Sequence, residues 1–432
     1  MSPEMTTRHR RVMPAWQALY YEEPIELVSG ESRYVVDREG RRYLDFFGGI
    51  LTTSVGHAVP EVVEAIREQA AKILHASTLY LAEPMVRLAE RIASLSTIPD
   101  ARVFFTTSGT EANDAALLMA TTYRRSNQVL AFRHSYHGRS FTTMAITGNR
   151  SWSASSLSGL AVSYVQSGYR LRSPFARLPD DEYVAACVQD LRDVIDTTTS
   201  GDVACMIAEP IQGVGGFATP PDGFFGAMKE VLDRYGILLI SDEVQTGWGR
   251  TGEHFWGFQA HGIVPDVITF AKGIANGLPL GGVIARADVM NSIHANSIST
   301  FGGNPIAVAA ADATLSYILD HDLQANALAR GEYLRSQLAP FVTRCPWIAE
   351  VRGKGLMLAL ETVVASRIEP DAAAAAALHE AAKRRGLLIG KGGLYGNVLR
   401  IAPPMSVTQH EVEEAADVLR AAIADVEAAR CA

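Results

Sequence analysis

A lysine and an aspartate each follow an apolar run, at positions where a buried charge is costly. Val267–Phe270 leads to Lys272, and the run at 237–241 leads to Asp242, 30 residues earlier. That spacing is about the length of one strand–helix–strand unit. Because ligands of open α/β sheets bind beyond the carboxyl ends of strands, both side chains should face one crevice. Taken alone, Asp242 could equally be a turn or capping residue, and Lys272 could reach solvent.

Together, Lys272 and Asp242 point to pyridoxal phosphate chemistry. A lysine in a desolvated pocket has a lowered pKa and can attack a carbonyl. A carboxylate that pairs with the protonated pyridine nitrogen lets the ring act as an electron sink. The pair therefore predicts a pyridoxal 5'-phosphate site, with Lys272 as the Schiff-base lysine and Asp242 as the partner of the ring nitrogen.

A phosphate site is predicted at Ser108–Thr110, where the run at 102–106 ends and a helix begins near Glu111. The N–H groups of a helix N-terminus and two hydroxyls can hold a phosphate. A plain helix cap is the alternative, and the absence of a following Gly-Lys-Ser/Thr excludes a Walker A loop. Tyr136 and His137 follow another apolar run, where an aromatic ring could stack on the pyridine.

Three further segments carry suitable groups. Glu209 ends the run at 203–209, so it should face the same sheet edge. The loop "STFGGNP", Ser299–Pro305, consists mostly of small residues that could lie close to a phosphate. Arg400 in "NVLRIAPP" offers a fork for a carboxylate, although an arginine in an exposed strand is more often solvated.

The elements that position these residues predict an α/β protein. Six apolar runs lack the alternation of half-exposed strands and are typical of buried parallel strands. They cover residues 102–106, 128–132, 203–209, 237–243, 267–271 and 280–285. Helix-like stretches such as 111–125 and 223–236 lie between them, which indicates a sheet covered on both faces. Residues 151–182 show no clear period and are predicted to form a long surface loop.

The chain is too long for one simple core, with 432 residues. From about residue 306 helical stretches dominate, with strands near 355–361 and 397–404, which predicts a smaller α+β domain. A hairpin within the first fifty residues should pack on it. The predicted division is an N-terminal segment at 1–51, a large domain at 52–305 and a small domain at 306–432.

Composition excludes several kinds of partner. The net charge of −8 argues against nucleic acid and anionic membranes, which favour a basic face. No apolar run approaches the roughly 20 residues that span a bilayer. The basic N-terminus has no apolar core behind it, so we expect no secretory signal, while an organelle transit peptide stays open as an alternative. The four cysteines are scattered without CxxC spacing, which favours the cytoplasm and neither disulfides nor a metal site.

The motifs together resemble the class III aminotransferases of pyridoxal-phosphate fold type I, over nearly the whole chain. They occur in the family order as "SGTEAND", "YHGRS", "EPIQG", "SDEVQTGWGRTG", "FAKGIANGLPLGG" and "STFGGNP". The nearest subgroup is the alanine–glyoxylate or β-alanine–pyruvate-like ω-transaminases, although loop 165–180 lacks the cysteine-containing form of the alanine–glyoxylate enzymes. The resemblance implies a large domain with a mostly parallel seven-stranded sheet, and a smaller α+β domain.

The resemblance also implies roles for individual residues. Lys272 is the implied catalytic residue, which also moves the proton from the substrate α-carbon. The implied cofactor contacts are Ser108, Gly109, Thr110, Tyr136, His137, Glu209, Asp242, Val244, Gln245, Lys272 and Thr300. Thr300 is expected to reach the phosphate of a neighbouring subunit, which implies a homodimer and leaves a tetramer open. Arg400 and Arg139 are expected to bind substrate carboxylates, with Glu209 as the switchable partner of Arg400.

The implied activity is transamination in two half-reactions, from an amino acid or ω-amine to a 2-oxo acid such as pyruvate, glyoxylate or 2-oxoglutarate. Aminomutases, racemases and phospho-lyases share this fold and lysine, so they stay open as alternatives. A non-catalytic scaffold is disfavoured, because it needs no buried lysine beside an acid. A nicotinamide-dependent oxidoreductase is also disfavoured, because no GxGxxG opens a strand–helix unit near the N-terminus. The sequence does not specify the donor.

Overall fold

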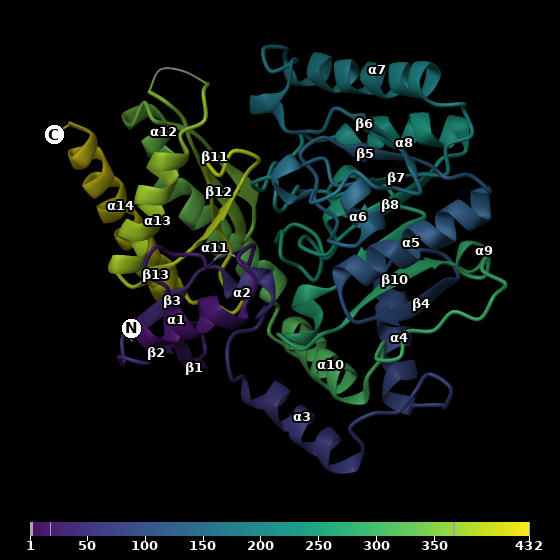
Figure 1. The fold of residues 1–432 in the computed structure, drawn as a ribbon, viewed down its shortest axis with the longest axis horizontal. Coiled ribbons are helices and arrows are strands. Elements are labelled where there is room, and N and C mark those ends of the chain that lie inside the picture. Colours follow the sequence, from purple (N-terminus) through teal and green to yellow (C-terminus); the bar gives the residue numbers. More distant parts are fainter. Residues whose placement is uncertain (1–2, 18, 366–367, 432) are drawn as a thin grey trace.

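The computed structural model describes residues 3–17, 19–365 and 368–431, and its centre is a seven-stranded sheet. The strand order is β4-β10-β9-β8-β7-β5-β6 (Figure 1). β10 is antiparallel to both neighbours, and every other pair is parallel. The strands are β4 (Ala101–Thr106), β5 (Gln128–Phe132), β6 (Ala161–Val165), β7 (Cys205–Ala208), β8 (Leu238–Asp242), β9 (Val267–Phe270) and β10 (Gly281–Arg286). The predicted mostly parallel sheet is therefore confirmed.

All six predicted strands are present, and one predicted loop is wrong. Residues 151–182 contain β6, which pairs with β5, and the helix α7 (Asp180–Thr198) begins within the same stretch. β6 is an edge strand whose residues are mostly half-exposed, and Ser163 interrupts its apolar side chains. It therefore lacks the continuous apolar run by which the central strands were found.

Helices cover both faces of this sheet, which explains the continuous apolar runs. Leu130 and Phe132 pack with residues of α7 and of α8 (Phe224–Tyr235) on one face. The alternate residues Val129 and Ala131 pack with α5 (Gly109–Arg124) on the other face. Successive strand residues point to opposite faces, so both sets must be apolar.

A smaller unit contains two further sheets. One has the order β11-β12-β15-β14 and the other β1-β2-β3-β13. These strands are β1 (Leu27–Glu31), β2 (Tyr34–Asp37), β3 (Arg42–Asp45), β11 (Ile348–Lys354), β12 (Met357–Thr362), β13 (Leu387–Leu388), β14 (Gly390–Gly392) and β15 (Val398–Ile401). The predicted N-terminal hairpin is β2–β3, and β3 pairs with β13. The N-terminal segment is thus joined to the C-terminal part, as predicted, while the numbered domain boundaries stay predictions.

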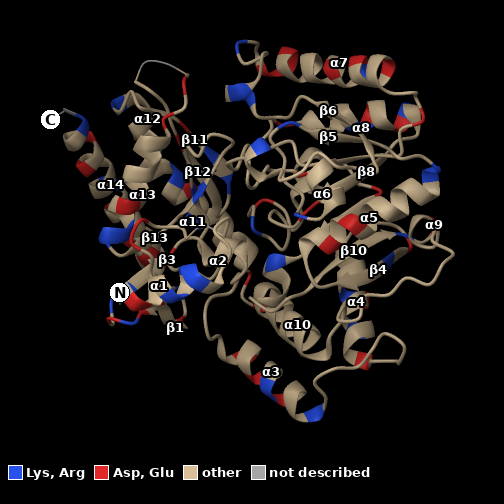
Figure 2. Ribbon diagram, viewed as in Figure 1, with Lys and Arg blue, Asp and Glu red and all other residues tan. Residues whose placement is uncertain are grey.

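The remaining helices complete the layers around the sheets. α10 packs on α3 and α4 beside the large sheet, and α13 packs on α14 in the smaller unit (Figure 1). They are α1 (Pro3–Val12), α2 (Gly48–Leu51), α3 (Pro60–Lys72), α4 (Glu83–Leu95), α6 (Phe141–Ala145), α9 (Ala287–Met290), α10 (Pro305–Asp320), α11 (Leu323–Leu338), α12 (Pro340–Arg344), α13 (Ala372–Arg384) and α14 (Gln409–Cys431). Figure 2 shows acidic and basic residues scattered over both units. Among the described residues, no helix is both long and apolar enough to span a membrane.

Candidate active site

A cavity of about 130 Å³ lies at the carboxyl ends of the central strands. All the residues predicted to contact the cofactor, except Thr300, line this cavity. Its lining residues are Ser108, Gly109, Thr110, Asn113, Tyr136, His137, Gly138, Glu209, Asp242, Val244, Gln245 and Lys272. Their convergence follows from the sheet order, because β7, β8 and β9 are neighbours and end at the same edge.

Lys272 lies two residues after the end of β9 and takes a left-handed backbone conformation, with φ of 48°. Desolvation lowers the pKa of its ammonium group to about 8, although the carboxylates of Asp242 and Glu209 oppose this shift. The amine is therefore partly unprotonated near neutral pH. The next residue, Gly273, does not have a positive φ. Gly273 is needed because a Cβ there would lie 2.2 Å from Ser54 Oγ.

Asp242 is buried and held by a set of polar side chains. Its Oδ2 accepts a hydrogen bond from Asn113 Nδ2 at 2.8 Å and lies 2.8 Å from His137 Nδ1. Asn113 Oδ1 accepts a bond from the Thr269 hydroxyl at 2.7 Å, which fixes the orientation of the amide. His137 thus contacts Asp242. The other oxygen of Asp242, Oδ1, accepts the Val244 N–H at 3.2 Å and can accept a further bond from the cofactor nitrogen.

The sequence analysis missed Asn113 and Thr269. The signal for Asn113 was its place four residues after Gly109, which puts both on one face of α5. Thr269 lies on β9, and in the sequence it looks like an ordinary β-branched residue of that strand. Its role becomes visible only when α5 is packed against the sheet.

The N-terminus of α5 forms the end of the cavity that suits a phosphate. Ser108 caps the helix, and its hydroxyl accepts from the Glu111 N–H at 3.2 Å. Among the described residues, no bond is found for the N–H groups of Gly109 and Thr110, as expected in the first turn of a helix, so both can donate to a phosphate. A Cβ at Gly138, whose φ is 143°, would lie 2.7 Å from Thr110 Oγ1, so the backbone must pass close here.

The side chains around the ring position fit pyridoxal phosphate. Gln245 Oε1 and His137 Nε2 are buried and have no hydrogen-bond partner within the described part of the chain. Gln245 Oε1 can accept from the phenolic hydroxyl of the cofactor, which would satisfy the buried carbonyl. A Cβ at Gly213 would overlap the Gln245 amide, at 2.0 Å from Nε2, so the amide lies directly against the glycine backbone. Val244 and Tyr136 supply an apolar and an aromatic surface to the same cavity.

Glu209 and Arg400 flank the cavity but do not form the predicted ion pair. Glu209 accepts from the N–H groups of Tyr136 at 2.9 Å and Gly213 at 2.8 Å, and burial raises its pKa to about 7. Arg400 is 4% exposed and donates to the carbonyls of Lys391 at 2.9 Å and Gly213 at 3.4 Å. The peptide of Gly213 therefore lies between the acid and the arginine, and contacts both.

Thr300 and Arg139 do not line the cavity of the single chain. Thr300 is exposed on a loop that is tied to the start of α5, because the Ser299 hydroxyl donates to Glu111 at 2.6 Å. The exposed Arg139 has its guanidinium carbon 5.5 Å from the centre of the Trp16 ring. Their predicted contacts, with a partner's phosphate and a second carboxylate, stay predictions.

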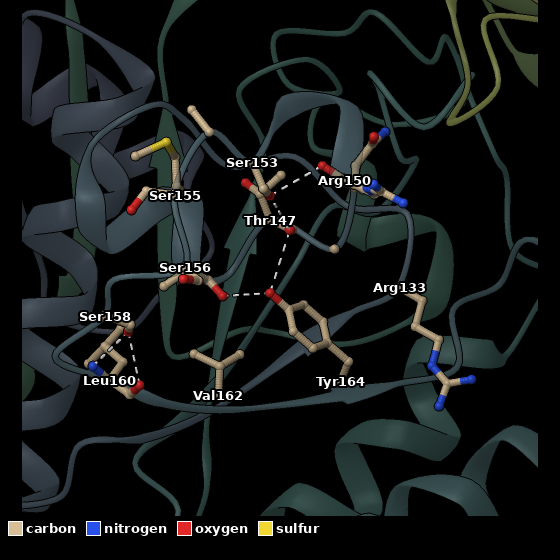
Figure 3. A pocket seen from close by; sticks show the side chains of 15 residues that line it. Arg133, Thr147, Arg150, Ser153, Ser155, Ser156, Ser158, Leu160, Val162 and Tyr164 are labelled. Carbon is tan, nitrogen blue, oxygen red and sulfur yellow. Dashed lines mark hydrogen bonds between the residues drawn. The ribbon is translucent and has the colours of Figure 1, made fainter.

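A larger cavity, about 770 Å³, lies between α6 and the loop before β6 (Figure 3). Much of its polar lining is already bonded internally, for example the Tyr164 hydroxyl to Ala145 and the Ser153 hydroxyl to Thr147. It contains none of the lysine, acid or phosphate motifs. Its size alone therefore does not make it the active site, and the chemistry belongs to the smaller cavity.

Comparison with known proteins agrees with this site. The family described as aminotransferase class III matches residues 19–423. Alanine–glyoxylate aminotransferase 2 homolog 2, mitochondrial, of Arabidopsis thaliana is 40% identical over 396 residues, covering 91% of this chain and 81% of the relative. The leucine/methionine racemase of Thermococcus litoralis is 35% identical, covering 99% and 96%. The PLP-bound structure of an amine transaminase from an uncultivated Pseudomonas species superposes with a TM-score of 0.89 and 31% identity, covering 94% and 96%.

Proposed function

We propose that this chain, which belongs to the class III aminotransferases, acts on substrates with a carboxylate that binds Arg400. It is a transaminase with pyridoxal phosphate as its cofactor. One observation carries the proposal. Arg400 is buried, yet among the described residues no carboxylate lies within ion-pair distance of it. An unpaired buried guanidinium is costly, and its planar fork matches a carboxylate. A substrate carboxylate would therefore complete a site that the chain leaves open.

The residues of the cavity divide the work of the reaction. Bound pyridoxal phosphate supplies a carbonyl that condenses with amines and a ring that accepts an electron pair. Lys272, with its pKa lowered to about 8, can take the proton from the donor α-carbon at Nζ and deliver it again. Asp242 pairs with the ring nitrogen through the oxygen that Asn113 and His137 leave available. The N-terminus of α5 holds the phosphate, and Gln245 orients the ring.

The proposed donors are amino acids or ω-amines, and the proposed acceptors are 2-oxo acids such as pyruvate, glyoxylate or 2-oxoglutarate. The names of the Arabidopsis relative and of the Pseudomonas enzyme support alanine, glyoxylate and simple amines as the first candidates. The test is a half-reaction screen in which holoenzyme is mixed with single amines and conversion to the pyridoxamine form is recorded by absorbance. Donors with an α-carboxylate should react at lower concentration than matched amines without one.

The racemase relative makes amino-acid racemisation the second candidate. The same screen separates the two activities. A transaminase leaves the pyridoxamine form and an oxo product, and it needs an oxo acid to turn over again. A racemase inverts the α-carbon and forms neither the pyridoxamine form nor an oxo product. Inversion of L-alanine without an oxo product would therefore overturn the proposed transamination of amino acids.

A homodimer is proposed from an exposed apolar surface beside Thr300. Leu79, Tyr80 and Leu81 are 73%, 71% and 99% exposed, and Phe301 is 60% exposed. The two segments adjoin, because the rings of His75 and Phe301 lie 5.4 Å apart. Contiguous exposed apolar side chains are typical of an interface. Burial of this surface would bring Thr300 towards a partner's phosphate site, and light scattering together with cofactor affinity of Thr300→Ala would test it.

We also propose a reducing compartment. The cysteines Cys187, Cys205 and Cys345 are free and buried. Free cysteines are typical of proteins in a reducing compartment. The cytoplasm is our prediction, and fractionation of the native cell would test it.

A further inference from the structure

Glu361 is a buried carboxylate that the reaction does not use directly. It lies on β12, is 0% exposed, and accepts hydrogen bonds from four different side chains. The donors are Arg352 Nη1 at 2.6 Å, Arg172 Nε at 2.9 Å, Asn397 Nδ2 at 3.1 Å and the hydroxyl of Tyr169. Burial would raise the pKa of Glu361, but the two arginines hold it below its ordinary value. A carboxylate so fully bonded has a defined place.

This cluster joins parts of the chain that are far apart in sequence. Tyr169 and Arg172 lie in the segment between β6 and α7, on the large-sheet side. Arg352 and Glu361 lie on the paired strands β11 and β12 of the smaller unit. The guanidinium carbon of Arg352 also lies 4.7 Å from the centre of the Tyr169 ring. The cluster is therefore a clamp between the two units.

The clamp reaches the active site through the turn at Gly213–Gly216. Arg352 donates to the Gly216 carbonyl from Nη2 at 2.6 Å and from Nε at 3.0 Å. The Gly216 N–H in turn donates to the Gly213 carbonyl at 3.1 Å. That same carbonyl accepts from Arg400, and the Gly213 N–H donates to Glu209. The backbone of Gly213, which contacts both Glu209 and Arg400, is thus linked to Arg352 through Gly216.

We propose that Glu361 is a positioning residue for the carboxylate side of the active site. It fixes Arg352, which fixes the Gly213–Gly216 turn, and this turn sets Glu209 and Arg400 relative to each other. The inference rests on the proposed role of Arg400 in binding the substrate carboxylate. It assigns no role to Glu361 in cofactor binding, because none of the residues it contacts lines the cavity.

The test compares two donors that differ only in the carboxylate, L-alanine and isopropylamine. Glu361→Gln removes the charge that orients Arg352 and keeps the shape of the side chain. The variant holoenzyme should show a KM for L-alanine raised about tenfold relative to that for isopropylamine, with kcat changed less than about threefold. The affinity for pyridoxal phosphate should be unchanged. A clamp that served stability alone would change the two donors equally.

Asp266→Asn is the matched control. Asp266 also pairs with an arginine, Arg286 at 2.7 Å, and accepts the Leu239 N–H at 2.9 Å. It precedes β9, so it lies at the end of the strands opposite the cavity. This variant should lose stability without changing the ratio of the two KM values. If Glu361→Gln does not fold, Tyr169→Phe is the second variant. It removes the hydroxyl that donates to Glu361 and accepts from Arg352 Nη2 at 3.3 Å, and it should shift the ratio in the same direction, by about threefold.

Arg400→Gln separates the two proposals. If it shifts the ratio and Glu361→Gln does not, the positioning role is overturned while the carboxylate site stands. If Arg400→Gln leaves the ratio unchanged, the carboxylate role of Arg400 is overturned, and the clamp proposal with it. A shift in all three of the variants Arg400→Gln, Glu361→Gln and Tyr169→Phe, with none in Asp266→Asn, supports both.

Discussion

The cofactor side and the carboxylate side of the cavity are built by different means. On the cofactor side, Asp242, Lys272 and the start of α5 all belong to one sheet and its covering helix. On the carboxylate side, Glu209 comes from the large sheet and Arg400 from β15 of the smaller unit. The backbone of Gly213 contacts both side chains. The first side depends on packing within one unit, and the second on how two units meet.

This difference predicts that the two sides can be damaged separately. Units that meet across an interface can shift relative to each other without loss of either core. A single sheet with both faces covered resists such shifts. Changes on the cofactor side should therefore alter the affinity for the cofactor, and with it the activity toward every substrate. Changes on the carboxylate side should alter the choice among substrates.

The largest expected effect removes the group that serves both sides. Lys272→Ala should lower kcat/KM by about 10⁴-fold or more for every donor, because no other amine in the cavity can move the α-carbon proton. Steady-state rates with L-alanine and with isopropylamine measure this, and both should fall equally. Lys72→Ala, at the exposed end of α3, is the control and should retain full activity. Substantial activity in Lys272→Ala would contradict the assigned role.

The second effect should divide the two sides. Arg400→Gln should raise KM for L-alanine about 10- to 100-fold, because it removes a charge-assisted pair with the carboxylate. It should leave KM for isopropylamine and the affinity for pyridoxal phosphate unchanged. Initial rates over a range of each donor give the comparison. Arg385→Gln removes an exposed arginine paired with Asp425 and serves as the control. A loss of cofactor affinity in Arg400→Gln would show that the two sides are not separate.

The sequence predicted these two sides to different depths. Strand ends in a parallel sheet converge by rule, so apolar runs that end in Asp242 and Lys272 were enough to predict the cofactor side. The missing strand β6 did not affect it, because β6 is at the sheet edge. The expected Glu209–Arg400 pair is absent, because the Gly213 peptide intervenes. No spacing along the chain encodes that contact, which depends on the path of a glycine-rich turn between two units.

Asn113 offers a smaller effect confined to the cofactor side. Asn113→Ala removes the bond to Asp242 Oδ2 and leaves the Thr269 hydroxyl without its acceptor. Affinity for pyridoxal phosphate should fall about tenfold, because a hydrogen bond to a charged group is lost in a buried site. Fluorescence titration of the apoprotein measures this, with Asn127→Ala as an exposed control. The KM ratio of the two donors should not move, and a change in it would mean that the cofactor side also sets donor choice.

The last prediction concerns the pKa of Lys272 and uses the apoprotein. Desolvation lowers that pKa to about 8 from the ordinary 10.5. Between these values the unfolded chain binds more protons than the folded chain, so the wild-type free energy of unfolding should rise as pH increases from about 8 to 10.5. Below pH 8 the folded chain bears the full cost of the buried charge. Lys272→Met has no such cost, so it should melt roughly a few degrees above the wild type at pH 7. The difference in melting temperature between Lys272→Met and the wild type should disappear towards pH 10. The control Lys72→Met should show no pH-dependent difference. A difference for Lys272→Met that stayed constant with pH would mean that the cavity does not lower the lysine pKa.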